Sequence, residues 1–199
     1  MLDLEAWQPW QPREAAAIFA SLPVPWYVAG GWAIDLSLGR QTREHEDLEI
    51  AISRKDFGAY RDFIASLGRF DLYDTGSAGV DLLTDGREPN PDNHQVWLYE
   101  RDARVWRTDT FLEPSEADIW VSHRDPRIRV PMAEAVRHDA DAIAYQAPAL
   151  VMFLKAKHAR DKDDADLAVT LPTLAAEERR WLAYAIELVH PGHRWLTQL

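Results

Sequence analysis

The sequence contains no cysteine among its 199 residues. Disulfide bonds and thiolate metal sites are therefore excluded, and no redox compartment is indicated. Long apolar runs are also missing, because no stretch approaches the roughly 20 residues that span a bilayer. Residues 1–5 lack the basic and apolar regions of a signal peptide. We expect a cytoplasmic protein that makes no membrane contact.

Basic residues are too few to balance the acidic ones. The chain has 22 Lys and Arg against 33 Asp and Glu, which gives a net charge of −11. A nucleic-acid partner is therefore unlikely on charge grounds, since such proteins normally carry a basic footprint. The charge suits a small cationic substrate, although it also serves solubility alone. The Walker A lysine, the dinucleotide fingerprint and the Gly-x-Ser-x-Gly elbow are all absent.

The order of expected elements predicts an α+β fold. Short apolar runs that end at Gly or Pro indicate strands, and helical spacing of apolar residues indicates helices. We expect helices at 13–22, 32–38, 54–67, 149–160, 163–169 and 173–189, and strands at 26–29, 47–52, 70–73, 95–99, 105–111, 119–122 and 127–130. Ser53 and Thr173 are the expected N-caps of two of these helices. A boundary near 147 would divide an α/β core, 1–147, from a helical part, 148–199.

The expected strand at 47–52 begins with two carboxylates. Positions two apart on a strand project from the same face, so Asp47 and Glu49 are placed to meet one cation. Magnesium takes oxygen ligands and commonly uses one or two carboxylates together with substrate phosphates. Taken alone, such a pair is also found as two solvated charges on an edge strand.

A double glycine, Gly30-Gly31, separates the first expected strand from a short helix that ends at Gly39. Backbone N–H groups at a helix N-terminus form an anion site, and glycine lets a phosphate approach the backbone closely. Taken alone, the same pair is found as a packing turn between a strand and a helix.

The two motifs together are more specific than either one. The run Gly30-Gly31-Trp32-Ala33-Ile34-Asp35, Leu38-Gly39-Arg40 and Thr42-Arg43-x-His45-x-Asp47-Leu48-Glu49-Ile50 resembles the nucleotidyltransferases of the DNA polymerase beta-like superfamily. Among these, it is most similar to aminoglycoside 2″-adenylyltransferase-like and lincosamide nucleotidyltransferase-like proteins. The motif covers about residues 26–52, and its second carboxylate is Glu where many relatives have Asp.

The resemblance implies roles for individual residues. Asp47 and Glu49 would hold Mg²⁺ against a nucleoside triphosphate, and a third carboxylate on a neighbouring strand would complete the site and act as a base. Asp109 is our choice for that carboxylate, because Asp is disfavoured inside a strand and its presence there indicates a functional role. Its rivals are Asp81 and Glu113. From the helical part, Lys155, or alternatively Lys157, would reach the triphosphate.

The residues before the metal strand and between the last helices complete the candidate set. Arg43 is suited to bidentate phosphate binding, and His45 is interpreted as a hydrogen-bonding scaffold residue near the nucleotide. Lys162 to Asp166 is interpreted mainly as helix capping and pairing between helices, with Asp166 also able to face an acceptor.

The implied fold is a mixed β-sheet core with helices packed on it and a C-terminal helical part. The implied activity uses two Mg²⁺ ions and ATP, or another NTP, to move a nucleoside monophosphate onto a hydroxyl of a small polar acceptor such as an aminoglycoside. The segment 113–118 is a candidate for receiving a cationic acceptor. Alternatives are a toxin-type enzyme acting on tRNA or protein, and a nucleotide-binding member without turnover. Both a monomer and a homodimer are compatible with the sequence.

Overall fold

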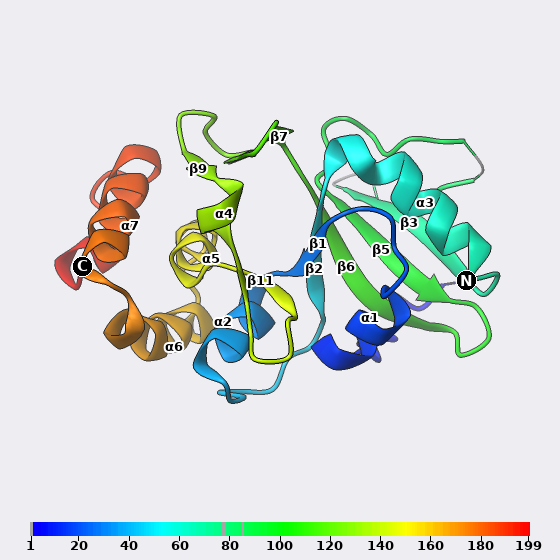
Figure 1. The fold of residues 1–199 in the computed structure, drawn as a ribbon, viewed down its shortest axis with the longest axis horizontal. Helices are drawn as coiled ribbons and strands as arrows, with labels where there is room; N and C mark the ends of the chain where they lie inside the picture. Colours follow the sequence, from blue (N-terminus) through cyan, green and yellow to red (C-terminus); the bar gives the residue numbers. More distant parts are fainter. Residues whose placement is uncertain (1, 77–78, 85) are drawn as a thin grey trace.

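The computed structural model describes residues 2–76, 79–84 and 86–199. An eight-stranded mixed sheet forms its centre, with strands in the order β10-β11-β1-β2-β6-β5-β3-β4, and a second sheet contains β7-β8-β9 (Figure 1). The strands are β1 (Trp26–Val28), β2 (Glu49–Ser53), β3 (Phe70–Gly76), β4 (Gly79–Leu82), β5 (Gln95–Glu100), β6 (Val105–Glu113), β7 (Ser115–Glu116), β8 (Ile119–Val121), β9 (Arg129–Pro131), β10 (Val136–His138) and β11 (Ala144–Gln146). The predicted α+β class with a mixed sheet is confirmed.

Seven α-helices surround this sheet in the described part of the chain. They are α1 (Pro12–Ile18), α2 (Gly30–Leu38), α3 (Phe57–Ser66), α4 (Met132–Ala135), α5 (Pro148–Lys155), α6 (Asp161–Thr170) and α7 (Ala176–Val189). Figure 1 shows α1 and α3 beside the strands at one side of the molecule and α5, α6 and α7 together at the other. The helix α2 ends as the sequence predicts, because Gly39 adopts the left-handed conformation (φ 65°) and its N–H bonds back to Asp35 and Leu36.

The pairing of β2 with β6 arranges side chains in rows across the sheet. These strands run parallel, with Glu49 opposite Asp109, Ala51 opposite Phe111 and Ser53 opposite Glu113. Since side chains alternate between the faces of a strand, all six point to one face of the sheet. The strand β5 extends the middle row with Gln95 beside Phe111.

The opposite face of the same strands belongs to the hydrophobic core. Ile50 and Ile52 are fully buried there, and Tyr60 of α3 hydrogen-bonds Thr110 over 3.1 Å. Because one face is covered by α3, the polar residues of the other face are left to form a site. A one-residue slip of register would exchange the two sets, so the burial of Ile50 and Ile52 also fixes where Glu49 points.

Several expected boundaries were wrong, and one of them concerns the site. Asp47 lies in a bend before β2, not on the strand, so the alternation argument applies to Glu49 only. The chain turns there because the preceding loop is held to Asp35 by Thr42 and His45. Asp47 and Glu49 therefore come together because Asp47 lies in the bend and Glu49 is the first residue of β2.

Three further expectations about helix ends were wrong. Ser53 occupies the N-cap position of a 3₁₀ turn (Arg54–Asp56) that precedes α3, but its side chain makes no cap, because its hydroxyl pairs with Ser115 over 2.5 Å. The helix α5 ends at Lys155, where Arg124 donates to the Leu154 carbonyl that a further helical turn would use. Thr173 lies in a 3₁₀ turn, and Ala175 occupies the N-cap position of α7.

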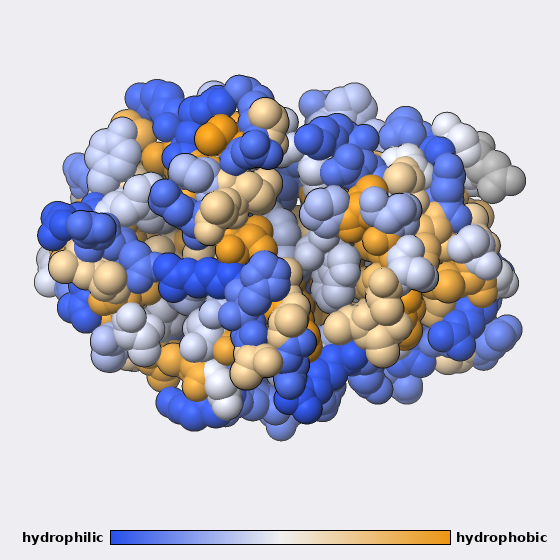
Figure 2. Space-filling view, in the orientation of Figure 1, coloured by the Kyte–Doolittle hydropathy of each residue, from blue (hydrophilic) through white to orange (hydrophobic). Residues whose placement is uncertain are grey.

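The surface in the orientation of Figure 1 carries hydrophobic residues interspersed among hydrophilic ones (Figure 2). Within the described residues, none of the helices combines the length and apolar character that a bilayer crossing requires.

The fully buried Ile50 offers a test of this core. Ile50→Ala should lower the free energy of unfolding by about 2–4 kcal/mol, because it removes apolar surface and leaves a cavity in the core behind β2. Urea denaturation followed by circular dichroism measures the change. Tyr184→Ala, at a position that is 59% exposed, is the control and should change stability by less than about 0.5 kcal/mol. Equal losses in both variants would contradict this placement of the core.

Candidate active site

The double glycine forms the turn from β1 directly into α2. Gly30 has φ +58°, a conformation that side chains rarely adopt, and the Glu49 carboxylate lies where a Cβ on Gly30 would stand, 1.3 Å from that position. A Cβ on Gly31 would lie 2.4 Å from Arg43 Nη2 and 2.7 Å from the His45 ring. Both glycines are therefore needed because three polar side chains approach the backbone at the start of the helix.

The buried Asp35 organises the loop that follows. It is 3% exposed. One of its carboxylate oxygens accepts hydrogen bonds from the Thr42 backbone N–H, at 3.0 Å, and hydroxyl, at 2.5 Å, and the other lies 2.6 Å from His45 Nε2. The His45 ring also stacks on Trp32 with 4.4 Å between centroids. Burial lowers the pKa of His45. His45 thus makes the kind of hydrogen bond that was expected of a scaffold residue, to the Asp35 carboxylate.

Glu49 and Asp109 are paired across β2 and β6 and belong to the same face of the sheet. Burial first, and then the charge of Asp47, raises the pKa of Glu49 to about 7. Burial, followed by the charges of Glu49 and Asp47, raises the pKa of Asp109 well above its ordinary value. Gln95 Nε2 donates to Asp109 Oδ2 over 2.7 Å. The structure thus brings the three predicted acidic residues into one mutually repelling set.

This donor set suits a hard divalent cation in its chemistry. Asp109 Oδ1 is buried and has no hydrogen-bond partner among the residues that the structure describes, and a cation would relieve the repulsion between the carboxylates. In the same described ranges, however, no group of three or more His, Cys, Asp or Glu side chains is already gathered to hold a metal. The Glu49 carboxylate instead lies against Gly30.

Two predicted cations meet at one buried carboxylate beside the glycines. Arg43 binds Asp166 in a bidentate manner, at 3.0 and 3.1 Å, and Lys155 Nζ lies 3.0 Å from Asp166 and 3.2 Å from Asp163. Asp166 and Asp163 are 2% and 0% exposed. The pairing of α6 with its neighbours therefore positions Arg43 and Lys155. Lys157 lies beyond the end of α5 and is exposed.

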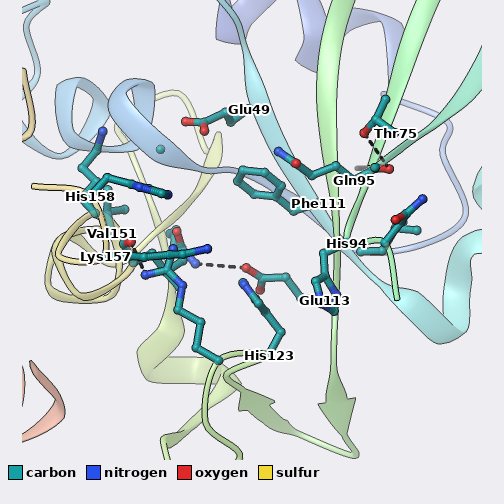
Figure 3. Close-up of a pocket in the computed structure, with 18 of the residues that line it drawn as sticks. Glu49, Thr75, His94, Gln95, Phe111, Glu113, His123, Val151, Lys157 and His158 are labelled. Carbon is teal, nitrogen blue, oxygen red and sulfur yellow. Dashed lines mark hydrogen bonds between the residues drawn. The ribbon is translucent and has the colours of Figure 1, made fainter. Parts of the chain in front are cut away.

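A cleft of about 590 Å³ opens over the polar face of the sheet. Figure 3 shows Glu49 at one end, Phe111 in the middle and Glu113 with His123 at the other end, while Lys157 and His158 reach in from the end of α5. The lining comprises Gly30, Glu49, Thr75, Gly76, Asp92, Asn93, His94, Gln95, Phe111, Leu112, Glu113, His123, Arg124, Gln146, Val151, Leu154, Lys155, Lys157, His158 and Arg160.

Glu113 is the polar centre of the far end of the cleft. Its Oε2 accepts hydrogen bonds from the Tyr27 hydroxyl and the Trp120 indole, and its Oε1 accepts one from Gln146 over 3.3 Å. Glu113 and Gln146 are 4% and 1% exposed. Burial is the main cause that raises the pKa of Glu113 to about 7. Glu113, a rival for the third carboxylate, therefore lies two rows from Glu49, whereas the other rival, Asp81, is exposed on β4.

The sequence analysis missed most of this far end. His94 and His123 stack with 4.6 Å between ring centroids although they are far apart in the chain. Burial and neighbouring cations lower the pKa of both, that of His123 to about 4. Glu113 did leave a signal, because it follows Asp109 by an even number of strand residues and so shares its face. Gln95, Gln146 and the two histidines left none.

Part of the chain resembles an adenylyltransferase family in sequence, and most of the chain resembles antibiotic adenylyltransferases in fold. A family model described as aminoglycoside-2″-adenylyltransferase matches residues 13–74, and no curated protein matches the chain. The crystal structure of ANT(2″)-Ia in complex with adenylyl-2″-tobramycin matches with a TM-score of 0.60 and 15% identity over 88% of this chain and 95% of that chain. The lincomycin-bound lincosamide antibiotic adenylyltransferase LnuA matches with a TM-score of 0.54 and 13% identity, over 80% of this chain and 93% of that chain.

These findings confirm the predicted resemblance and the predicted fold. The residues matched by the family model include the glycine turn, Asp47 and Glu49. The family match and the shared fold together indicate a nucleotidyltransferase.

The raised pKa of Glu113 predicts a particular dependence of stability on pH. Between about pH 4.5, its ordinary value, and about pH 7, the folded state keeps a proton that the unfolded chain has lost. The free energy of unfolding should therefore fall as the pH rises through this window, by up to about 3 kcal/mol at 1.36 kcal/mol per pKa unit. Urea titrations at half-unit pH steps measure this slope.

The matched variants separate Glu113 from the other acids. Glu113→Gln keeps acceptor and donor groups for Tyr27, Trp120 and Gln146 but cannot ionise, so its stability should vary less with pH across the window. Asp118→Asn, an equivalent change at an exposed position five residues further on, should leave the slope of the unmodified protein intact. A slope that Glu113→Gln leaves unchanged would show that Glu113 titrates normally.

Proposed function

We propose that this protein transfers a nucleoside monophosphate, AMP from ATP, to a hydroxyl of a small polar acceptor and releases pyrophosphate. One observation carries the proposal: Gly30, Glu49 and Lys155 line one end of a cleft. Asp109 is paired with Glu49 on the sheet, and Arg43 is joined to Lys155 through Asp166. Phosphoryl chemistry requires this combination of positioning and charge stabilisation.

The triphosphate would lie at the glycine end of the cleft. Backbone N–H groups at the start of α2 favour anions, and Arg43 and Lys155 supply positive charge within reach of them. The Glu49 carboxylate now lies in this place against Gly30. Binding of the nucleotide would therefore require the Glu49 side chain to turn toward Asp109. The helical part, 148–199, would contribute Lys155 to the core, 1–147.

Asp109 would accept the proton of the acceptor hydroxyl. The acceptor oxygen then bonds to the α-phosphorus, the bond from that phosphorus to the pyrophosphate oxygen breaks, and pyrophosphate leaves toward Arg43 and Lys155. Gln95 donates to one Asp109 oxygen over 2.7 Å, and the other oxygen has no hydrogen-bond partner in the described part of the chain. Two Mg²⁺ ions held by Asp47, Glu49 and Asp109 would supply charge neutralisation and keep Asp109 ionised.

The acceptor proposed from the resemblance is an antibiotic hydroxyl. The matched structures are described with adenylyl-2″-tobramycin and with lincomycin. A panel of aminoglycosides, lincosamides, bulk tRNA and cell protein, incubated with labelled ATP and Mg²⁺, tests this proposal. Label on RNA or protein alone would replace the small acceptor with a macromolecule. ATP binding without pyrophosphate release for any acceptor would indicate a member without turnover.

Carboxylate variants test the catalytic assignment. Asp47→Asn and Asp109→Asn should each lower the rate of AMP transfer at least about 100-fold, because each removes a negative charge from the set proposed to hold the metal. Asp81→Asn, the exposed rival on β4, should keep the rate of the unmodified protein. Asp109→Asn should not lower the melting temperature, since it relieves repulsion with Glu49. Full activity of Asp109→Asn would exclude it as the base.

Lysine variants test the triphosphate assignment. Lys155→Met should raise the KM for ATP about 10-fold or more and lower kcat, because it removes a cation next to Arg43 and the glycine turn. Lys162→Met is the control, since Lys162 is half-buried and pairs with Glu46 outside the cleft. Steady-state pyrophosphate release at varied ATP measures both. Equal kinetics of the two variants would remove Lys155 from the proposed site.

A further inference from the structure

The far end of the cleft is separated from the glycine turn by one row of the sheet. The rows are Glu49 with Asp109, then Ala51 with Phe111, then Ser53 with Glu113. Figure 3 shows the same sequence of side chains, from Glu49 past the Phe111 ring to Glu113. Phe111 is half-buried, so part of its ring forms an apolar floor between two polar ends.

The geometry of phosphoryl transfer indicates which end of the cleft would hold the leaving group and which would hold the acceptor. In phosphoryl transfer the attacking and leaving oxygens lie roughly in line on opposite sides of the phosphorus. Under the proposed function, pyrophosphate leaves toward Gly30, Gly31 and Lys155. The acceptor must therefore approach Asp109 from the other side, over Phe111 and toward Glu113.

Buried polar groups at this end require a partner. Gln146 is 1% exposed, yet its Oε1 has no hydrogen-bond partner among the residues that the structure describes. Its Nε2 is already used by Glu113. A buried acceptor without a donor is costly, and a ligand O–H or N–H in the cleft would satisfy it. Gln146 therefore marks a place for a hydrogen-bond donor of the acceptor molecule.

The charges at this end do not suit a polycation. Arg124 and Lys157 line it and lie near enough to His123 to lower its pKa. The stacked histidines, His94 and His123, are neutral at physiological pH because burial lowers both pKa values, with a further contribution from Arg54 at His94 and from Arg124 and Lys157 at His123. Arg124 and Lys157 supply two positive charges at this end. Glu113 supplies at most one negative charge, because its pKa of about 7 leaves it about half ionised near pH 7.

Of the remaining acids of the region, only Asp92 lines this end, near His94. Glu116 is paired with Arg129, and Asp118 is exposed and does not line the cleft. Asp92 lines the cleft from an exposed position. The acidic segment 113–118 thus contributes only Glu113 to the cleft, and the expected attraction for a cationic acceptor is weak there.

We infer that the Phe111, Glu113 and Gln146 end of the cleft is the acceptor subsite, and that it takes a hydroxyl-bearing molecule with an apolar face and no more than one positive charge. This inference rests on the proposed function for the side from which the acceptor approaches. It separates lincosamide-like acceptors from polycationic aminoglycosides.

Calorimetric binding in the presence of Mg²⁺ and a non-hydrolysable ATP analogue tests the inference. Lincomycin, which has a sugar and a single basic amine, should bind at least about 10-fold more tightly than the polycation tobramycin. Gln146→Met should weaken lincomycin at least 5-fold, with the Kd of the ATP analogue unchanged. Tighter binding of tobramycin than of lincomycin, or binding of neither, would overturn the inference.

A charge reversal on the surface gives a second readout that does not depend on a buried position. Lys157→Glu should shift the ratio of the two Kd values at least 10-fold toward tobramycin. Lys55→Glu, an exposed position outside the cleft, makes the same change in net charge and should leave the ratio within 2-fold. Equal shifts in both variants would show a general charge effect and contradict the subsite.

Transfer of label from ATP separates this inference from the proposed function. Binding of lincomycin in the expected order without AMP transfer would contradict the proposed function and leave the assignment of the ligand class standing. AMP transfer to tobramycin with higher kcat/KM than to lincomycin would uphold the function and overturn the inference.

Discussion

The parallel pairing of β2 with β6 is the constraint on which the site depends. Five consecutive residue pairs join two strands that are about sixty residues apart in the chain. The pairing places Glu49 beside Asp109. Phe111 and Glu113, two and four residues further along β6, face the same cleft. Ile50 and Ile52 fix the register by filling the core behind it. The same register therefore decides which side chains of these strands face the cleft and which face the core.

Buried carboxylates hold the loops around this ladder in place. Asp35 fastens Thr42 and His45, and Asp166 fastens Arg43 and Lys155. Each of these acids is nearly inaccessible to water, so its partners satisfy charge that would otherwise be costly to bury. The cations near the glycine turn are therefore held in place by contacts within the protein, which under the proposed function reduces the ordering that binding of a triphosphate must impose.

The cleft has two ends with different electrostatic character. At the glycine end, repelling carboxylates stand beside Arg43 and Lys155, an arrangement that suits a metal-bound polyanion. At the far end, the buried Glu113 and Gln146 line the cleft together with neutral histidines, two cations and the exposed Asp92. The apolar ring of Phe111 separates them. One sheet face can therefore serve two ligands of different charge, and the same register sets the distance between them.

The sequence by itself determined the strand and helix order up to Gly39, the glycine turn and the neighbouring acids, because these signals are local. It also pointed to Asp109, since an acid inside a strand conflicts with strand propensity. Only the tertiary structure decided that Asp47 precedes the strand, that Asp166 serves the cations and that Gln146 is buried beside Glu113. Those features arise from contacts between residues distant in the chain, and no local pattern of side chains encodes them.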